Sequence, residues 1–245
     1  MKKRLLTRLI AAALVPLLFA GCEQAPQPPL VFGASAWPGY EPVYLARELG
    51  YLQGANLRLD AYASPEEAEE AIRSGKANLV GVTLERALLL RSDLPDLKVI
   101  LLFDSAPPST PTAEGKTGGG RRSQPARRID VLVTRDESIG RYHRELGQFL
   151  GGWRRALDYM RSDPDNAMKI MAQREHLAPA QFKALLDGME LYSLQRNQQL
   201  MIGEPAPIGS AVEAAQRALL NEGKLRVGVD PSMLLDSTIL AESPK

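Results

Sequence analysis

Cysteine and histidine are almost absent from this sequence. Cys22 is the only cysteine among the 245 residues, which excludes an internal disulfide and a cysteine-based metal site. The two histidines, His143 and His176, lie in polar surroundings, so we expect both at the surface rather than in a catalytic or metal-binding role. The sequence also has no HExxH motif, no GxSxG motif and no clustered acidic ligand set. We therefore predict a protein that is not an enzyme and has no catalytic residues, no metal and no cofactor.

A large excess of charge of either sign is also missing. The formal net charge is +1, with 44% hydrophobic and 24% charged residues. This balance is ordinary for a globular protein and gives no indication of a nucleic-acid or acidic partner.

The sequence begins with a short hydrophobic run behind a basic start. Residues 9–20 are apolar but too few to span a bilayer comfortably, and four basic residues lie between positions 2 and 8. Ala20 and Gly21 are small, and Cys22 follows them directly, with Phe19 where such a motif more often has Leu. The arrangement resembles the lipobox of bacterial lipoproteins, so residues 1–21 are predicted to be a signal peptide and Cys22 to carry the lipid. The alternative is an ordinary secretory signal followed by a chance cysteine.

Strand and helix patterns alternate after a Gln- and Pro-rich tether, residues 22–29. Ser64, Pro65 and Glu67 have the spacing of a helix start with a capping box. The alternation indicates an α/β fold with a mainly parallel sheet flanked by helices, followed by C-terminal helices whose apolar residues, Trp153 among them, are expected in the core. Strands are predicted at 30–34, 57–62, 79–83, 98–103 and 129–134, and helices at 42–49, 64–75, 85–92, 145–160, 163–173, 179–188 and 210–221.

Residues 105–128 interrupt this pattern, because they contain no Val, Leu, Ile, Met or aromatic residue. Such a segment cannot bury enough apolar surface to offset its ordering entropy, and it is predicted to be a disordered linker. The Gly115-Lys116-Thr117 stretch does not complete a phosphate-binding loop, because Thr110 stands where the first glycine is required. The four arginines of the 105–128 segment are interpreted as solvated side chains rather than as a contact for lipid or nucleic acid.

Several stretches in order resemble the substrate-binding proteins of bacterial ABC importers, specifically the NMT1/TauA-like family that handles nitrate, taurine, sulfonates and thiamine-precursor pyrimidines. The resemblance lies in Trp-Pro-Gly-Tyr-Glu-Pro at 37–42, the stretches at 45–52 and 81–85, and those at 130–136 and 152–159. It implies the type II periplasmic-binding-protein fold, in which two lobes close over a small solute. In this chain the linker takes the place of the second lobe. We therefore expect one lobe, residues 30–104 and 129–245, with the second lobe largely missing.

Solutes of open α/β sheets bind beyond the carboxyl ends of the strands, near helix N-termini. On this basis, and by the resemblance of the Trp37 turn and the Thr83 loop, we predict a ligand site. Trp37 and Tyr40 have an alternative role, packing under the turn. Glu85 and Asp104 would repel a bare anion, so an amine-bearing or heterocyclic solute fits as well as a sulfonate. The predicted site consists of Ser35, Trp37, Gly39, Tyr40, Thr83, Glu85, Asp104 and Ser105.

The resemblance implies a lipid-anchored solute-binding component on the periplasmic side of a bacterial membrane, working with an ABC permease and its ATPase. A site with one wall is expected to bind weakly or not at all, and the apolar surface left by the lost lobe favours a homodimer or instability. The alternative is a truncated, non-transporting lipoprotein that acts as an interaction module or is vestigial. An enzyme related to pyrimidine synthesis is disfavoured by the signal sequence and the scarcity of histidine.

Overall fold

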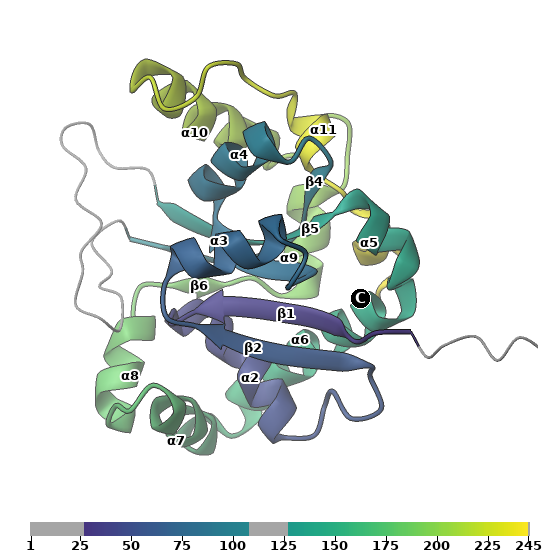
Figure 1. Ribbon diagram of the computed structural model, residues 1–245. Helices are drawn as coiled ribbons and strands as arrows, with labels where there is room; N and C mark the ends of the chain where they lie inside the picture. The colour runs from purple at the N-terminus through teal and green to yellow at the C-terminus, as the bar shows by residue number, and fades with distance from the viewer. Residues whose placement is uncertain (1–26, 108–126, 245) are drawn as a thin grey trace, which may run out of the picture.

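The computed structural model describes residues 27–107 and 127–244, and its elements are shown in Figure 1. The predicted signal peptide, Cys22 and most of the predicted linker lie outside the described residues. Within the described ranges, no helix combines the length and the apolar character that crossing a membrane requires.

Six strands form one sheet in the order β2-β1-β3-β5-β4-β6. β1 pairs in parallel with β2 and β3, while β5 lies antiparallel between β3 and β4, and β6 is antiparallel to β4. β1, β2, β3 and β4 therefore run in the same direction, as predicted for a parallel sheet. The ladders that join β5 to β3 and β4, and β6 to β4, are antiparallel. The strands are β1 (Leu30–Ser35), β2 (Leu57–Tyr62), β3 (Leu79–Thr83), β4 (Leu97–Ala106), β5 (Arg128–Arg135) and β6 (Glu190–Leu191).

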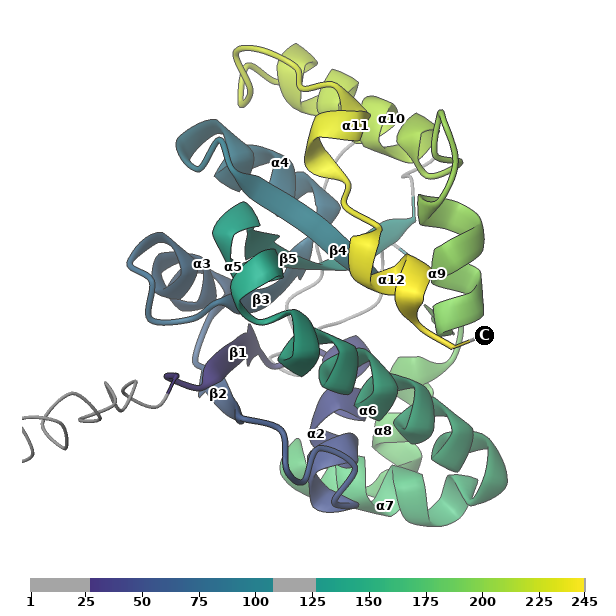
Figure 2. The ribbon, with the colours of Figure 1, turned by 90° about the vertical axis from the view of Figure 1, so that its right-hand side faces the viewer.

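Helices cover both faces of the sheet (Figures 1 and 2). α3 packs on β1 and β3, and α4 on β3, β4 and β5, while α2, α6 and α7 pack against one another on the opposite side. The helices are α2 (Glu41–Glu48), α3 (Pro65–Arg73), α4 (Leu84–Asp93), α5 (Asp136–Arg141), α6 (His143–Ser162), α7 (Pro164–Arg174), α8 (Pro179–Leu186), α9 (Leu194–Met201), α10 (Gly209–Asn221), α11 (Pro231–Leu234) and α12 (Thr238–Glu242), with a 3₁₀ turn η2 at Pro38–Tyr40.

The start of α3 shows how local sequence sets an element. The Ser64 side chain accepts a hydrogen bond from the Glu67 backbone N–H at 3.2 Å, as the capping pattern predicts. The Glu67 carboxylate returns to the backbone N–H of Ala63 at 3.0 Å, one residue before the cap residue itself. The bond to Ser64 satisfies a donor that the helix start would otherwise leave without a partner, and the bond to Ala63 ties the preceding residue to the first turn.

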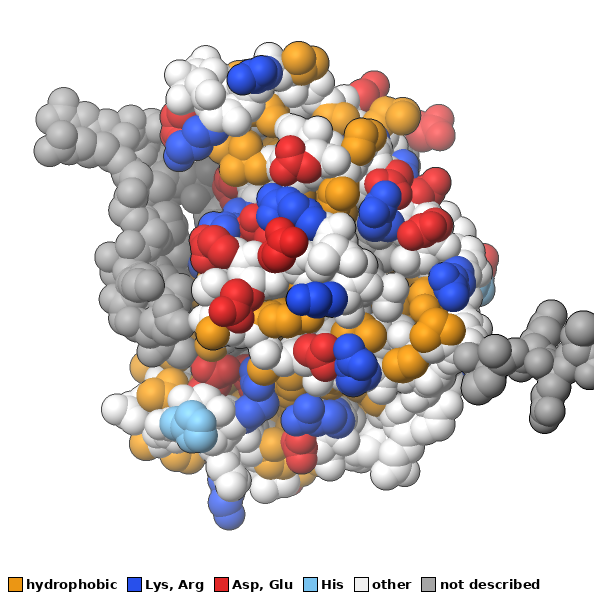
Figure 3. Space-filling model, viewed as in Figure 1, with side chains coloured by type: hydrophobic (Ala, Val, Ile, Leu, Met, Phe, Trp, Pro, Cys, Tyr) orange, Lys and Arg blue, Asp and Glu red, His pale blue; other side chains and the backbone are white. Residues whose placement is uncertain are grey.

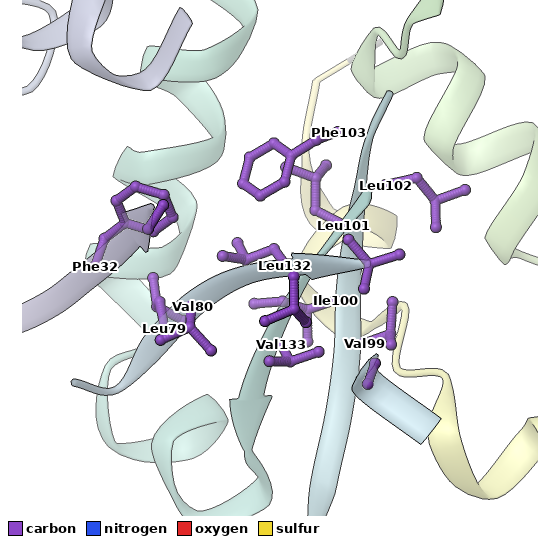
Figure 4. Packing of buried hydrophobic residues seen from close by; sticks show 14 of the residues in the cluster. Phe32, Leu79, Val80, Val99, Ile100, Leu101, Leu102, Phe103, Leu132 and Val133 are labelled. Carbon is purple, nitrogen blue, oxygen red and sulfur yellow. The ribbon is translucent and has the colours of Figure 1, made fainter. Parts of the chain in front are cut away.

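Aromatic rings from the sheet and from α6 form the centre of the core. Phe103 of β4 lies 6.2 Å from the Phe32 ring and 5.2 Å from the Trp153 ring, both edge-on, and Figure 4 shows Phe32 and Phe103 among the branched side chains of neighbouring strands. Trp153 is 1% exposed, and its indole N–H donates to the carbonyl of Tyr192. The prediction that Trp153 is a core residue is confirmed.

The structure differs from the sequence prediction at the two ends of the linker. β4 continues to Ala106 and β5 begins at Arg128, because these two residues pair with each other at the end of the antiparallel ladder. Backbone pairing thus orders positions that hydrophobicity alone places in a disordered segment. Further along, the short elements α5, α9, α11, α12 and β6 were not predicted.

Charged side chains of both signs are interspersed on the face that carries α3 and β2 (Figure 3). This mixture agrees with the small net charge of the sequence.

Candidate functional site

Two aspartates meet at the carboxyl-end edge of the sheet. Asp104 of β4 pairs directly with Asp130 of β5, and Asp130 in turn pairs with Thr83 at the end of β3. Directly paired residues project from the same face, so the three positions form one row across three strands. Both aspartates are completely buried. A buried pair of carboxylates needs hydrogen-bond donors or a cation nearby.

Trp37 supplies one donor. The turn after β1 directs its indole Nε1–H to Asp104 Oδ2 at 3.0 Å, and Trp37 is 1% exposed. Gly39 makes this approach possible, because a Cβ atom at that position would lie 1.8 Å from the same oxygen. A glycine is therefore required within the turn by close packing.

Tyr40 supplies a second donor. Its hydroxyl lies 2.5 Å from Asp130 Oδ1, and its ring lies against Gly81 of β3, where a Cβ atom would come within 2.9 Å of the ring. Burial, followed by the charge of Asp130, raises the pKa of Tyr40 well above its usual value. The hydroxyl therefore keeps its proton and donates it in the hydrogen bond.

Arg128 supplies the cation. Its guanidinium forms a two-pronged pair with Asp130, with Nε to Oδ2 at 2.5 Å and Nη2 to Oδ1 at 2.8 Å. The carbon at the centre of the guanidinium lies 3.6 Å from the centroid of the Trp37 ring, the geometry of a cation–π stack. Arg128 thus covers the indole face and neutralises one of the two aspartates.

Asp104 is incompletely satisfied. Oδ2 accepts the indole bond, whereas Oδ1 is buried without a hydrogen-bond partner among the described residues. Burial, followed by the charge of Asp130, raises the pKa of Asp104 well above its usual value, although Trp37 and Arg128 act in the opposite direction. The site therefore holds one acceptor atom that the fold itself does not use.

Arg127 binds the rim of this cluster. Its guanidinium donates to the Ser105 hydroxyl at 2.9 Å, to the Ser105 carbonyl at 2.7 Å and to the Gly188 carbonyl at 2.9 Å. Its side chain is exposed, so the cluster has a second, more accessible cation beside the buried one.

The structure brings together four of the eight predicted ligand residues: Trp37, Gly39, Tyr40 and Asp104. Ser105 lies next to them and is held by Arg127.

The other three predicted residues have different places. Ser35 is buried at the end of β1, opposite Tyr62 of β2. The Thr83 hydroxyl accepts from the backbone N–H of Arg86 at 3.2 Å and so caps α4, although Thr83 also borders Asp130 in the sheet. Glu85 lies in the first turn of α4 and is partly buried. Ligand contact by the eight residues stays a prediction. The alternative role of Trp37 and Tyr40, packing under the turn, also stays a prediction.

Sequence reasoning missed Arg128 and Asp130. Both were assigned away from the site, Arg128 to the linker and Asp130 to an ordinary strand. The usable signal is their spacing, because residues two apart in a strand project from the same face. The Arg-Ile-Asp triplet at 128–130 therefore predicts a charged pair on one face of β5.

Two cavities among the described residues lie away from this cluster. One of about 400 Å³ lies between α2 and α7 and is lined by Glu41, Tyr44 and Arg174 among others. Another of about 810 Å³ lies among the segments around α9, α10 and α11. Neither is lined by Trp37 or Asp104, whose surroundings are occupied by the side chains of the chain itself.

Comparison with known proteins identifies the fold. No family model matches the sequence, and no curated protein matches it. Among solved structures, the alkanesulfonate-binding protein SsuA from Xanthomonas axonopodis pv. citri bound to MOPS has a TM-score of 0.62 at 12% identity, covering 87% of this chain and 100% of that one.

Two further structures agree. The periplasmic aliphatic sulphonate binding protein SsuA from Escherichia coli has a TM-score of 0.63 at 10% identity, covering 86% of this chain and 93% of that one. The Candida albicans CA3427 gene product, described as exhibiting the generic periplasmic binding protein structural fold, has a TM-score of 0.63 at 11% identity, covering 86% of this chain and 97% of that one. DszB in complex with biphenyl-2-sulfinic acid is also similar, with a TM-score of 0.57 at 10% identity.

These similarities confirm the predicted fold class. The chain has a periplasmic-binding-protein fold, present as a single lobe-like unit with one mixed sheet flanked by helices. Identities of this size establish the fold and leave function to be argued from the site.

Proposed function

We propose that this chain is the lipid-anchored solute-binding component of an ABC importer and is not an enzyme. The observation that carries the proposal is the cluster of Trp37, Asp104, Asp130 and Arg128 at the carboxyl ends of the strands, where ligands of open α/β sheets bind. The likeness to SsuA structures supports the same role.

The expected solute is a small molecule from the sulfonate, nitrate, taurine or pyrimidine class. Two buried aspartates beside Trp37 disfavour a bare anion at this place, so among the candidate solutes those that carry N–H donors are favoured. Arg127, exposed at the rim, is placed to contact an anionic portion of the same solute.

The remaining parts of the proposal follow from the sequence. A lipid on Cys22 would hold the chain on the periplasmic side of a bacterial membrane, beside a permease and its ATPase. The residues between β4 and β5 would bridge the position of a lost second lobe, and a second copy of the chain would supply the missing wall as a homodimer.

The experiment is thermal melting of the full chain with a panel of sulfonates, nitrate, taurine and pyrimidines at millimolar concentration. A solute that binds only the folded state raises the melting temperature by mass action. A saturable rise with one solute, abolished by Asp104→Asn but kept in Asp96→Asn, supports the proposal. Asp96 is the matched control, because it pairs with Arg135 at the opposite end of the same ladder. Cooperative melting without a shift for any solute would contradict it.

A second candidate function is favoured by one specific observation. Arg128 already covers Trp37 and pairs with Asp130, so the cluster is largely satisfied without a solute. A truncated lipoprotein that acts as an interaction module, or is vestigial, would have such a closed site. The melting experiment separates the two functions.

A further inference from the structure

Arg128 behaves as a guanidinium ligand bound to its own protein. Its planar guanidinium stacks on the Trp37 ring and forms a bidentate ion pair with Asp130. Asp104 lies directly across the ladder from Asp130. Planar stacking on an aromatic face combined with a two-pronged carboxylate pair is the recognition geometry specific to guanidinium-like cations. The aromatic face and the carboxylates therefore match the shape and charge of a guanidinium group.

Two observations indicate that the fold does not require Arg128 to be the permanent occupant. The Arg128 side chain is 28% exposed, whereas Asp130 beneath it is not exposed at all, so the cation enters from the solvent side. Asp104 Oδ1 is buried and has no partner among the described residues, and Arg128 makes its hydrogen bonds to Asp130. A ligand with one more N–H donor would satisfy an atom that Arg128 leaves unused.

We propose that the cluster binds a solute through a guanidinium or amidinium group, which replaces Arg128 between Trp37 and the two aspartates, and that Arg128 closes the site when no solute is present. This inference rests on the proposed function and specifies the group by which the solute is held. The inference favours solutes that carry a cationic nitrogen group over sulfonates.

The exchange is balanced in charge. The leaving Arg128 guanidinium and the entering group both carry one positive charge, so Asp130 stays neutralised throughout. The displaced Arg128 moves outward toward solvent. Because the two cations compete for one place, the apparent affinity of the native chain is reduced by the fraction of molecules in which Arg128 occupies the site.

The test is thermal melting of the full chain and of the Arg128→Ala and Arg135→Ala variants with methylguanidinium chloride, using methanesulfonate and sodium chloride as the comparison salts. Arg135 is the matched control, because it pairs with Asp96 at the other end of β5. At concentrations of about 10 mM or below, general denaturation by the cation is small and common to all three proteins. A methylguanidinium-specific rise in melting temperature then reports binding to the folded state.

The proposal predicts a saturable rise for the native chain and for Arg128→Ala, with half-saturation at a concentration lower by about tenfold or more in the variant, since the competitor is gone. Arg135→Ala should behave like the native chain. Adding Asp104→Asn to Arg128→Ala should weaken the response severalfold, because the free carboxylate oxygen is replaced.

Three results would overturn the inference: no methylguanidinium response in Arg128→Ala beyond that of Arg135→Ala, a response that Asp104→Asn leaves unchanged, or a response confined to the variant and absent from the native chain. If Arg128→Ala does not fold, Arg128→Gln and the native-chain titration decide the question. Binding of methanesulfonate or taurine without methylguanidinium would refute this inference while the proposed function stands. Absence of binding by any solute would refute both.

Discussion

Asp104 and Asp130 lie directly opposite each other in the antiparallel ladder between β4 and β5, and both side chains are completely buried. Like charges in such a cross-strand pair are destabilising, yet among the described residues an arginine pairs with Asp130 and none pairs with Asp104. A fold under selection for stability alone would place a neutral residue at one of the two positions. The pair is therefore the strongest structural sign of a binding role.

The first prediction concerns Asp104→Asn, which we expect to stabilise the chain at neutral pH. The Asn side chain keeps an acceptor for the Trp37 indole and removes one of the two neighbouring negative charges. The gain should be about 1–3 kcal/mol, the cost of a buried group without a partner. Urea unfolding of both proteins at pH 7.5 measures it.

The pH dependence of this gain has a definite sign. Burial and the charge of Asp130 raise the pKa of Asp104 in the folded chain. At pH values between the pKa of the unfolded chain and that of the folded chain, the folded chain therefore binds more protons than the unfolded chain. The native chain therefore loses stability as pH rises through that range, and the advantage of the Asn variant should shrink toward pH of about 4.

The matched control is Asp96→Asn. Burial alone would raise the pKa of Asp96, but the hydrogen bond and charge of Arg135 outweigh it and the pKa is lowered. This half-exposed pair should give a loss below about 1 kcal/mol at neutral pH, vanishing in acid. An Asp104→Asn variant less stable than Asp96→Asn would contradict the account.

The second prediction concerns Gly39→Ala. The new Cβ would lie 1.8 Å from Asp104 Oδ2 and 2.8 Å from Trp37 Nε1, so the turn must shift and the indole bond must break. We expect a loss of about 1–3 kcal/mol, the usual range for overpacking. Gly147→Ala on α6 is the control, because its Cβ meets no atom within 4 Å and should stabilise the helix by about 0.4–1 kcal/mol. Thermal melting with equal effects in the two variants would be the contrary result.

The third prediction concerns the pair that joins α2 to α7. Glu41 is completely buried, and Arg174 Nε lies 2.9 Å from Oε1 and 2.8 Å from Oε2. Burial raises the pKa of Glu41 to about 8, against the lowering effect of Arg174. Arg174→Met leaves the carboxyl without its cation and should cost about 3–5 kcal/mol at pH 8.5, measured by urea unfolding.

Two comparisons check the origin of this loss. The folded pKa of Glu41 is raised, so its contribution to stability falls as pH rises, and the Arg174→Met deficit should be smaller at pH 5.5. The double variant with Glu41→Gln should recover most of the loss, since no charge remains buried. A deficit independent of both pH and Glu41→Gln would show that lost packing, rather than an unpaired charge, is responsible.

The fourth prediction concerns Asn197 of α9, whose side chain completes the hydrogen bonding of β4. It donates to the Leu102 carbonyl at 2.9 Å and accepts from the Leu102 N–H at 2.6 Å, and it is completely buried. Asn197→Leu leaves the N–H and the carbonyl of Leu102 buried without these partners and should cost about 2–5 kcal/mol. Gln199→Leu, exposed on the same helix, should change stability by less than about 0.5 kcal/mol. Comparable losses in chemical unfolding of the two variants would refute this role.

Much of this fold could be predicted from the sequence because helix starts and strand alternation depend on residues close together in the chain. Ser64 caps α3 with its own side chain, and the alternating residues at 57–62 form the edge strand β2 as their pattern indicates. Trp37 and Asp104 were identified because strand ends are where such sheets bind ligands. The antiparallel insertion of β5 depends on contacts between distant segments and left no local mark. The same holds for α9, which is fixed through Asn197.

Arg128 shows the limit most clearly. Composition places it in a polar linker, and it becomes part of the site only because the ladder pairs it with Ala106 and aligns Asp130 with Asp104. No propensity or motif encodes that register.

The fluorescence of Trp37 during solute titration reports directly whether a solute displaces Arg128 from the indole ring. The sequence contains two tryptophans, Trp37 and Trp153, so Trp153→Phe leaves Trp37 as the single indole reporter. We expect a saturable change in its emission when a solute with a guanidinium or amidinium group displaces Arg128 from the ring. A folded Trp153→Phe protein whose emission stays unchanged with methylguanidinium, and with every sulfonate, nitrate, taurine and pyrimidine tested, would contradict it.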